Sequence, residues 1–360
     1  MVVILGIEST AHTFGVGVVK GGGVKPFATS SKRGQSNGKV LSNCKKVFTT
    51  EKGGMIPIEV AKFHCENKNE IYFEALDLAK IKESDVDAVA FSQGPGLAPC
   101  LLEGMKFAKE LSKRLGKPVV GVNHCIAHLE IGRITGAKDP VMLYASGANT
   151  QIIAYASGKY RIFGETLDIG VGNFIDTFAR YAGIGFPGGP VIAKLAEKGT
   201  PQAYPEKSSQ KIFTKGRKYI ELPYKVKGMD IALSGILTNL KQKFESGKYK
   251  LNDLAYSMQE TVFSMLVETA ERALAHTGKK ELLLGGGVAC NTRLQEMCKI
   301  MCKERGAKLF VPENQFLVDN AGMIAYLGEI MFRAGIMEKN VEKIDIHPRE
   351  RTDDVSVGWK

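Results

Sequence analysis

Two stretches far apart in the sequence share one design: an apolar strand, a turn of small polar residues and a returning strand. The first spans residues 2–19 and turns at 8–10, and the second spans residues 141–156 and turns at 146–150. Period-two alternation bounded by turn residues predicts β-hairpins. Segments of alternating helical and strand character follow each hairpin, which is typical of α/β structure. The repetition predicts two similar α/β halves with a ligand between them.

A pair of histidines, His124 and His128, follows an apolar run at 118–122 that predicts a buried strand. Positions four apart lie on one face of a helix, so both imidazoles can reach a single metal ion. The spacing is equally compatible with two partly buried histidines bonded to backbone groups. Zinc proteases share it but need a Glu at the second position as general base. Cys125 stands there, so we expect no peptidase.

Length and composition set the broad class. The chain has 360 residues, enough for two domains, and 44% of them are hydrophobic. We expect no membrane span, because no apolar run approaches the roughly 20 residues that one needs. The start has no charged leader, so we expect no signal peptide. Seven cysteines without a Cys-x-x-Cys pair favour a reduced, cytoplasmic protein.

The net charge of +11 favours a polyanionic partner such as nucleic acid, although a lysine-rich surface would give the same value. Residues 201–230 are polar and basic. They are a candidate RNA contact and equally an ordinary solvated surface. The segment at 21–39, rich in Gly, Ser, Lys and Arg, predicts an exposed loop.

Two further segments carry features of nucleotide sites. A glycine turn at 285–289 joins a strand to a helix that we expect to open at Cys290. Such turns let backbone amides face phosphate, and the helix dipole supports the charge. Asp176 stands in a predicted helix after a small-residue turn. Its carboxylate either helps to cap or solvate that helix, or bonds a ligand hydroxyl as acidic residues bind ribose.

Eight motifs occur in the order of one known family, at residues 6–8, 49–54, 93–97, 123–128, 146–151, 186–190, 285–291 and 319–325. The chain resembles the archaeal and eukaryotic type of tRNA N6-adenosine threonylcarbamoyltransferase, the catalytic subunit of the KEOPS complex. The resemblance implies the two-lobed α/β fold of actin, sugar kinases and heat-shock chaperones (the ASKHA fold). It places a nucleotide and a metal site in the cleft between the lobes. We expect a first lobe of residues 1–129 plus 321–347, a second lobe of residues 130–320 and a basic tail at 348–360.

The resemblance also implies the reaction. The threonylcarbamoyl group of threonylcarbamoyl-adenylate is transferred to N6 of adenosine 37 in tRNAs that read codons beginning with adenine. The partners implied are tRNA and the KEOPS subunits, namely a small atypical kinase, a small dimerising subunit and a kinase-binding regulator. We expect helices at 57–69 and 101–111 to present apolar surface to the dimerising subunit.

Site residues carry over from the family motifs. One metal ion is implied, and two imidazoles with hard oxygen ligands favour iron, with zinc second. The ion would act as a Lewis acid. The implied metal ligands are His124, His128, Tyr144 and Asp319. The implied contacts to the adenylate or ATP are Tyr144, Ala145, Ser146, Gly147, Ala148, Asp176, Gly189 and Asn291.

The sequence departs from the family pattern in three places. Ala193 stands where the family has an acidic residue that faces the ribose, which bears on ligand affinity. The helix near Pro57 carries Phe63 and His64 in place of a His-His pair, which removes support for a functional role of His64. Residues 21–37 resemble an insertion.

Three rival functions remain at this level. The first is a metallopeptidase, disfavoured by the absent Glu. The second is an ATP-dependent kinase of the same fold, which would use a carboxylate base and Mg²⁺. The third is a non-enzymatic RNA-binding scaffold, which has no need of a metal constellation.

Overall fold

A computed structural model describes residues 1–21, 38–50, 54–197 and 218–360. Most of the expected exposed loop at 21–39 lies outside these ranges. So do three residues of the motif at 49–54 and most of the basic segment at 201–230. All remaining predicted elements fall within the described part of the chain.

The first lobe is built on a five-stranded sheet in the order β3-β2-β1-β4-β5. Strands β1, β2 and β3 pair antiparallel, whereas β4 and β5 continue the sheet in parallel. The hairpin expected at 2–19 is therefore confirmed. The strands are β1 (Val2–Glu8), β2 (Thr13–Gly21), β3 (Lys39–Val47), β4 (Ala88–Gly94) and β5 (Val119–Asn123).

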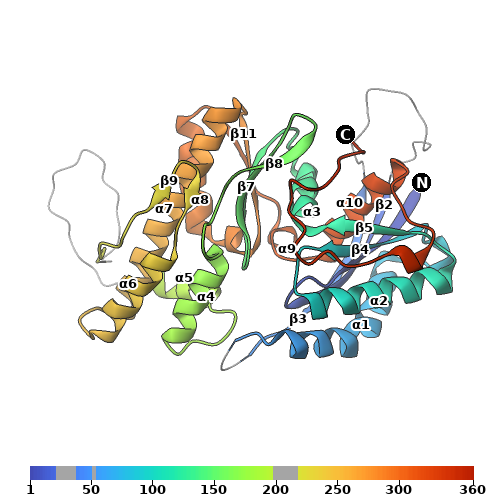
Figure 1. Cartoon of the computed structure of the whole chain (residues 1–360), viewed down its shortest axis with the longest axis horizontal. Helices are drawn as coiled ribbons and strands as arrows, with labels where there is room; N and C mark the ends of the chain where they lie inside the picture. The colour runs from blue at the N-terminus through green and yellow to red at the C-terminus, as the bar shows by residue number, and fades with distance from the viewer. Residues whose placement is uncertain (22–37, 51–53, 198–217) are drawn as a thin grey trace.

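The second lobe repeats this plan. Its sheet has the order β12-β11-β6-β7-β8, with an antiparallel meander β6-β7-β8 and two parallel strands beyond β6. Figure 1 shows the two lobes side by side, and the two-lobed α/β fold is as predicted. The strands are β6 (Val141–Ala145), β7 (Thr150–Ala156), β8 (Lys159–Glu165), β11 (Glu281–Gly285) and β12 (Lys308–Phe310), with a small ladder of β9 (Val226–Lys227) and β10 (Asp230–Ile231).

Helices cover both sheets. In the first lobe they are α1 (Pro57–Ala79), α2 (Ala98–Leu115), α3 (His124–Ile131) and α10 (Ala321–Arg333). The others are α4 (Val171–Tyr181), α5 (Gly189–Glu197), α6 (Ser234–Glu245), α7 (Leu251–Thr277), α8 (Thr292–Glu304) and the short α9 (Asn314–Leu317). The predicted helix at the glycine turn begins at Thr292 rather than Cys290, because residues Gly287–Cys290 form a 3₁₀ turn first.

Strand β1 separates two cores. Leu5 packs with residues of α1 and α2, whereas Ile4 packs with residues of α10 on the opposite face. This is the period-two alternation of a strand buried on both faces. Gly6 faces α10 at very short range, since a Cβ there would lie 2.5 Å from the backbone nitrogen of Ala325. Helix α10 is thus pressed against β1, which fixes the position of the residues just before it.

The predicted basic tail at 348–360 is not basic. Its three basic residues are balanced by Glu350, Asp353 and Asp354. It also packs against the rest of the chain, and Trp359 is buried. The division of the chain into lobes at 129/130 and 320/321 stays a prediction.

His64 lies in the core between α1 and β2. Its ring is 5.3 Å from that of Phe14 and 6.2 Å from that of Phe63, between centroids. Neither ring nitrogen has a hydrogen-bond partner among the described residues. Burial lowers the pKa of His64 to about 4, so the residue is a neutral core side chain at neutral pH.

We predict that His64→Leu removes part of the acid sensitivity of the fold. The pKa of His64 is about 4 in the folded state and about 6.5 in an unfolded chain. The unfolded chain therefore binds more protons between these values, and the wild type loses stability as pH falls through this window, by up to roughly 3 kcal/mol. Denaturant unfolding of both proteins from pH 8 to pH 4 measures the difference. A wild-type-minus-variant difference that does not change with pH would contradict the prediction.

Candidate metal and nucleotide site

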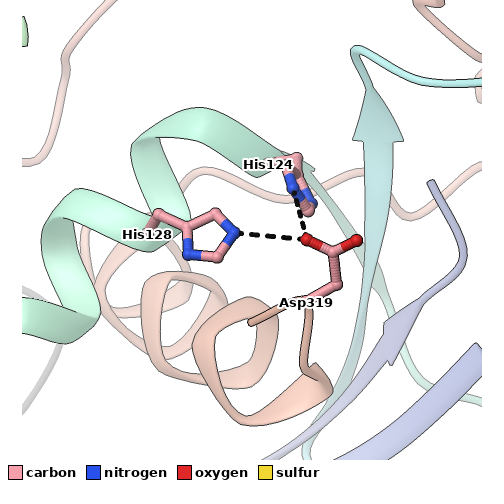
Figure 2. A group of neighbouring side chains, drawn as sticks. All are labelled: His124, His128 and Asp319. Atoms are coloured by element: carbon pink, nitrogen blue, oxygen red, sulfur yellow. Dashed lines mark ion pairs between the residues drawn. The ribbon is translucent and has the colours of Figure 1, made fainter. Parts of the chain in front are cut away.

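Two histidines lie on α3, directly after strand β5, where the two lobes meet. Asn123 ends the strand and caps α3, because its side-chain oxygen accepts from the backbone N–H of Ile126 at 3.1 Å. One helical turn then aims both imidazoles at Asp319 (Figure 2). The Nε2 atoms of His124 and His128 lie 3.3 Å and 3.5 Å from Asp319 Oδ1. The ligand atoms of these three residues all lie within 4.8 Å of one another.

Asp319 sits in the short connection between α9 and α10. The next residue, Asn320, caps α10 by accepting from the N–H of Met323 at 2.9 Å, and its amide donates to the carbonyl of Val318 at 2.8 Å. Burial raises the pKa of Asp319, but the two histidines beside its carboxylate outweigh burial and hold that pKa well below its usual range. Asp319 is therefore an anion, held in place by the helix that follows it.

Glu8, at the end of β1, contacts the histidine–carboxylate cluster formed by His124, His128 and Asp319. Its Oε2 lies 3.0 Å from His124 Nδ1, and its Oε1 accepts from the N–H of Thr10 at 2.8 Å and from its hydroxyl at 2.5 Å. Burial lowers the pKa of His124, but Glu8 and Asp319 outweigh burial and raise it well above its usual value. In the neutral tautomer that metal binding requires, Nδ1–H donates to Glu8 and the Nε2 lone pair faces the side of Asp319.

No role was predicted for Glu8 from the sequence. The available signal was a carboxylate at the end of a buried apolar strand, followed by two hydroxyl residues. Nothing in that pattern says that the strand end lies beside a helix more than one hundred residues later.

Tyr144 approaches from the second lobe. It lies in β6, is fully buried, and its ring centroid is 5.0 Å from that of His128. Its hydroxyl has no hydrogen-bond partner among the described residues. Burial raises the pKa of Tyr144 well above its usual value. The structure thus brings together side chains from β1, α3, β6 and the segment before α10.

The small-residue turn after β6 lies against the glycine turn. The backbone N–H groups of Gly172 and Asn173 donate to the carbonyls of Ser146 and Gly147, at 2.9 Å each. Gly286 has a left-handed φ of 90°, and a Cβ there would lie 2.3 Å from the carbonyl oxygen of Ala145. Only glycine permits this approach. The predicted contacts Ala145 and Ser146 therefore neighbour the glycine turn, whereas Gly147 and Ala148 lie against the start of α4.

Asp176 holds the turn before α5. Its Oδ1 accepts from the N–H of Gly188 at 2.8 Å and from that of Gly189 at 3.2 Å. The carboxylate therefore caps the next helix rather than its own. Burial raises the pKa of Asp176, and the two backbone hydrogen bonds oppose burial.

A small apolar pocket lies between α4, α5, α7 and the start of α8. Gly189, Ala193 and Asn291 all line it. The Asn291 amide donates to Gln259 Oε1 at 2.9 Å, while its oxygen caps α8. The remaining lining residues are Phe174, Ile175, Ile192, Met258, Gln259, Val262 and Phe263. The lining contains no charged side chain, and an apolar wall with two amides suits a flat base better than a phosphate.

The fold and site define a class: a two-lobed α/β protein with a histidine–carboxylate cluster where its lobes meet. Two solved structures share the fold at low identity. T. kodakarensis HypF has a TM-score of 0.57 at 15% identity, over 94% of this chain and 48% of that one. A phosphate- and nucleotide-bound full-length HypF has a TM-score of 0.55 at 12% identity, over 92% and 56%.

A family profile described as tRNA N6-adenosine threonylcarbamoyltransferase matches residues 39–326. A protein of that name from Thermococcus sibiricus is 51% identical, over 99% of this chain and 100% of its own length. One from Thermofilum pendens is 45% identical, over 99% of this chain and 97% of its own length. A probable bifunctional tRNA threonylcarbamoyladenosine biosynthesis protein from Methanosarcina mazei is 46% identical, over 99% of this chain and 59% of its own length. The chain belongs to the tRNA N6-adenosine threonylcarbamoyltransferase family. It is a transferase of tRNA threonylcarbamoyladenosine formation, as predicted.

We predict that Ala193→Glu tightens adenosine binding about ten- to hundredfold, because a carboxylate on a ribose hydroxyl contributes roughly 1.5–3 kcal/mol. Ala193 lines the pocket beside Gly189 and Asn291, so a longer side chain there reaches a ligand without crossing the core. Titration calorimetry with adenosine and with 2′,3′-dideoxyadenosine checks this. The gain should vanish for the dideoxy ligand. Equal affinity of both proteins for adenosine would mean that residue 193 does not face the ribose.

Proposed function

We propose that the chain transfers the threonylcarbamoyl group of threonylcarbamoyl-adenylate to N6 of adenosine 37 in tRNAs that read codons beginning with adenine. We further propose that one metal ion takes part, held by His124, His128, Tyr144 and Asp319. The observation that carries the proposal is the convergence of His124, His128 and Asp319, whose ligand atoms lie within 4.8 Å of one another.

The donor set fits a metal ion. Two neutral imidazoles, a phenol oxygen and a carboxylate suit iron best, with zinc second. The Tyr144 hydroxyl and both ring nitrogens of His128 are buried without a hydrogen-bond partner among the described residues. Buried polar atoms without partners are costly, and a bound cation would satisfy the tyrosine oxygen and one nitrogen of His128. Glu8 behind His124 supports the fit, since metal-bound histidines donate their other N–H to such a group.

The chain's own residues would bind and orient the substrate. Glu8 fixes the ring of His124, and Asn320 fixes the backbone beside Asp319. The apolar pocket beside Asn291 would hold the adenine, and the glycine turn at 285–289 would direct backbone amides at the phosphate. A bound ion would supply Lewis-acid polarisation of the transferred group. In the transfer, N6 bonds to the carbamoyl carbon, the bond from that carbon to the phosphate oxygen breaks, and N6 loses a proton.

The rival functions lack support in the site. The acidic residue on α3, Glu130, is fully buried and engaged by Arg133, Tyr160 and Lys360. It is therefore in no position to activate water for a peptidase. Neither phosphoryl transfer to a sugar nor a purely structural role accounts for a histidine–carboxylate cluster beside an unpartnered tyrosine.

We predict that His124→Ala abolishes stoichiometric metal binding. The variant removes one of two nitrogen donors and leaves the buried charge of Glu8 unpaired. Elemental analysis of purified wild type and variant measures the bound iron and zinc. The matched control is His276→Ala, which removes an exposed histidine on α7 and should keep full occupancy. Full occupancy in His124→Ala would eliminate the proposed site.

Partners are proposed from the exposed surface of the first lobe. Large apolar side chains project from α1 and α2, with Ile58 72%, Phe73 58% and Leu102 36% exposed. Exposed apolar side chains of this size on adjacent helices favour a protein contact. We propose that this surface binds a small dimerising subunit of a KEOPS-type complex, in which a small atypical kinase and a kinase-binding regulator also act.

We predict slow modification of tRNA by the isolated chain and faster modification with these partners. Phosphate contacts by dispersed lysines give affinity without placing one base. Mass spectrometry of nucleosides, after incubation with tRNA and threonylcarbamoyl-adenylate, measures the product. Ile58→Glu combined with Phe73→Glu should remove the stimulation by the partners and leave the rate of the isolated chain unchanged. Ile300→Glu, on α8 of the second lobe, should leave the stimulation in place. Equal rates with and without partners would refute the dependence, and no product under any condition would refute the activity.

The cellular location is also a proposal. All seven cysteines are free thiols, which supports the cytoplasm, where thiols stay reduced. Among the described residues, no helix is both long and apolar enough to cross a membrane.

A further inference from the structure

Lys45 on β3 places an ammonium group beside the histidine–carboxylate cluster. Its Nζ donates to the backbone carbonyl of Asp319 at 3.1 Å. The next residue, Lys46, points to the other face of the strand, as alternation requires. Its Nζ reaches Glu70 of α1 at 2.6 Å and Asn67 at 3.0 Å. Two neighbouring lysines thus have different surroundings, one at the site and one at the outer surface.

The surroundings of Lys45 leave its charge incompletely matched. The side chain is half-buried, and the ion pairs found in the described part of the chain do not include it. Burial lowers the pKa of Lys45, while the charges of Asp319, Cys290 and Glu8 oppose that effect. An ammonium has three N–H donors, and the Asp319 carbonyl uses one of them. A partly desolvated cation gains from an anion that supplies acceptors for the others.

Lys45 reaches the metal side of the proposed substrate site. Its Nζ contacts the backbone of Asp319, whose carboxylate faces both histidines. Strand β3 also holds the same connection through Asn43, whose side-chain oxygen accepts from the N–H of Gly322 at 3.1 Å. The first-lobe strand therefore braces this connection and places a cation beside it.

We propose that Lys45 binds an anionic group of the substrate, which deepens the proposed function and rests on it. Threonylcarbamoyl-adenylate has two such groups, the phosphate of the adenylate and the carboxylate of the threonine. Lysine binds either as a point charge with several donors. At the phosphate, Lys45 would also stabilise the charge left on the departing adenylate when the carbon–oxygen bond breaks.

The test compares Lys45→Gln, Lys45→Arg and the matched control Lys46→Gln. Calorimetry with AMP, N-carbamoylthreonine and adenosine separates phosphate, carboxylate and neutral ligand. Lys45→Gln should weaken one of the two anions about ten- to hundredfold and leave adenosine unchanged. Lys45→Arg should restore most of the affinity, and Lys46→Gln should match the wild type. A loss of affinity for AMP identifies the phosphate as the group that Lys45 binds. A loss of affinity for N-carbamoylthreonine identifies the carboxylate.

Three outcomes would overturn the proposal. Unchanged affinity of Lys45→Gln for both anions removes Lys45 from substrate binding while leaving the proposed function intact. Loss of bound iron or zinc together with anion affinity in Lys45→Gln would mean that the residue acts by holding Asp319. A wild type that binds none of the three ligands would instead remove the proposed nucleotide site, and the role of Lys45 with it.

Discussion

A buried chain of ionisable groups from Glu8 through His124 to Asp319 is the constraint on which the site depends. Glu8 is fully buried, and the side chain of Asp319 is 15% exposed. Two carboxylates withdrawn from water are stable only when each is paired. His124 contacts both, at 3.0 Å through Nδ1 and 3.3 Å through Nε2. The imidazole therefore joins the end of β1 to the connection before α10. Loss of any one member leaves a buried charge without its partner.

The close packing of α10 on β1 makes that geometry possible. The absence of a side chain at Gly6 lets the helix approach the strand at backbone distance. Asn320 then fixes where the helix begins, and Asp319 precedes it by one residue. A side chain at position 6 would push the helix outward and carry Asp319 away from His124. The cluster is thus placed by backbone contact between α10 and β1, as well as by the contacts among Glu8, His124 and Asp319.

The sequence was most informative where structure depends on local pattern. Alternation predicted both hairpins, and the spacing of His124 and His128 correctly predicted one helical face. It was least informative where partners come from distant segments. Nothing in the sequence around Glu8 or Lys45 indicates that both contact the neighbourhood of Asp319. Asp176 illustrates the same limit, since a cap on the following helix forms only once the turn at Gly188 folds back toward α4. The tail at 348–360 was predicted to be basic, but its three acidic side chains balance its three basic ones.

The tail at 348–360 holds both ends of α3, the helix that carries His124 and His128. Glu350 accepts a hydrogen bond from Asn123, the N-cap of α3, at 2.8 Å. Lys360 lies 3.2 Å from Glu130 near the other end of the helix. Between these points Arg351 contacts Glu165 of β8 at 3.2 Å, so the tail touches both lobes. Because Glu130 is fully buried, withdrawing Lys360 would leave Arg133 as its remaining cationic partner. The segment that follows α10 therefore returns to fix the helix whose histidines face Asp319, and it couples the orientation of those histidines to the second lobe.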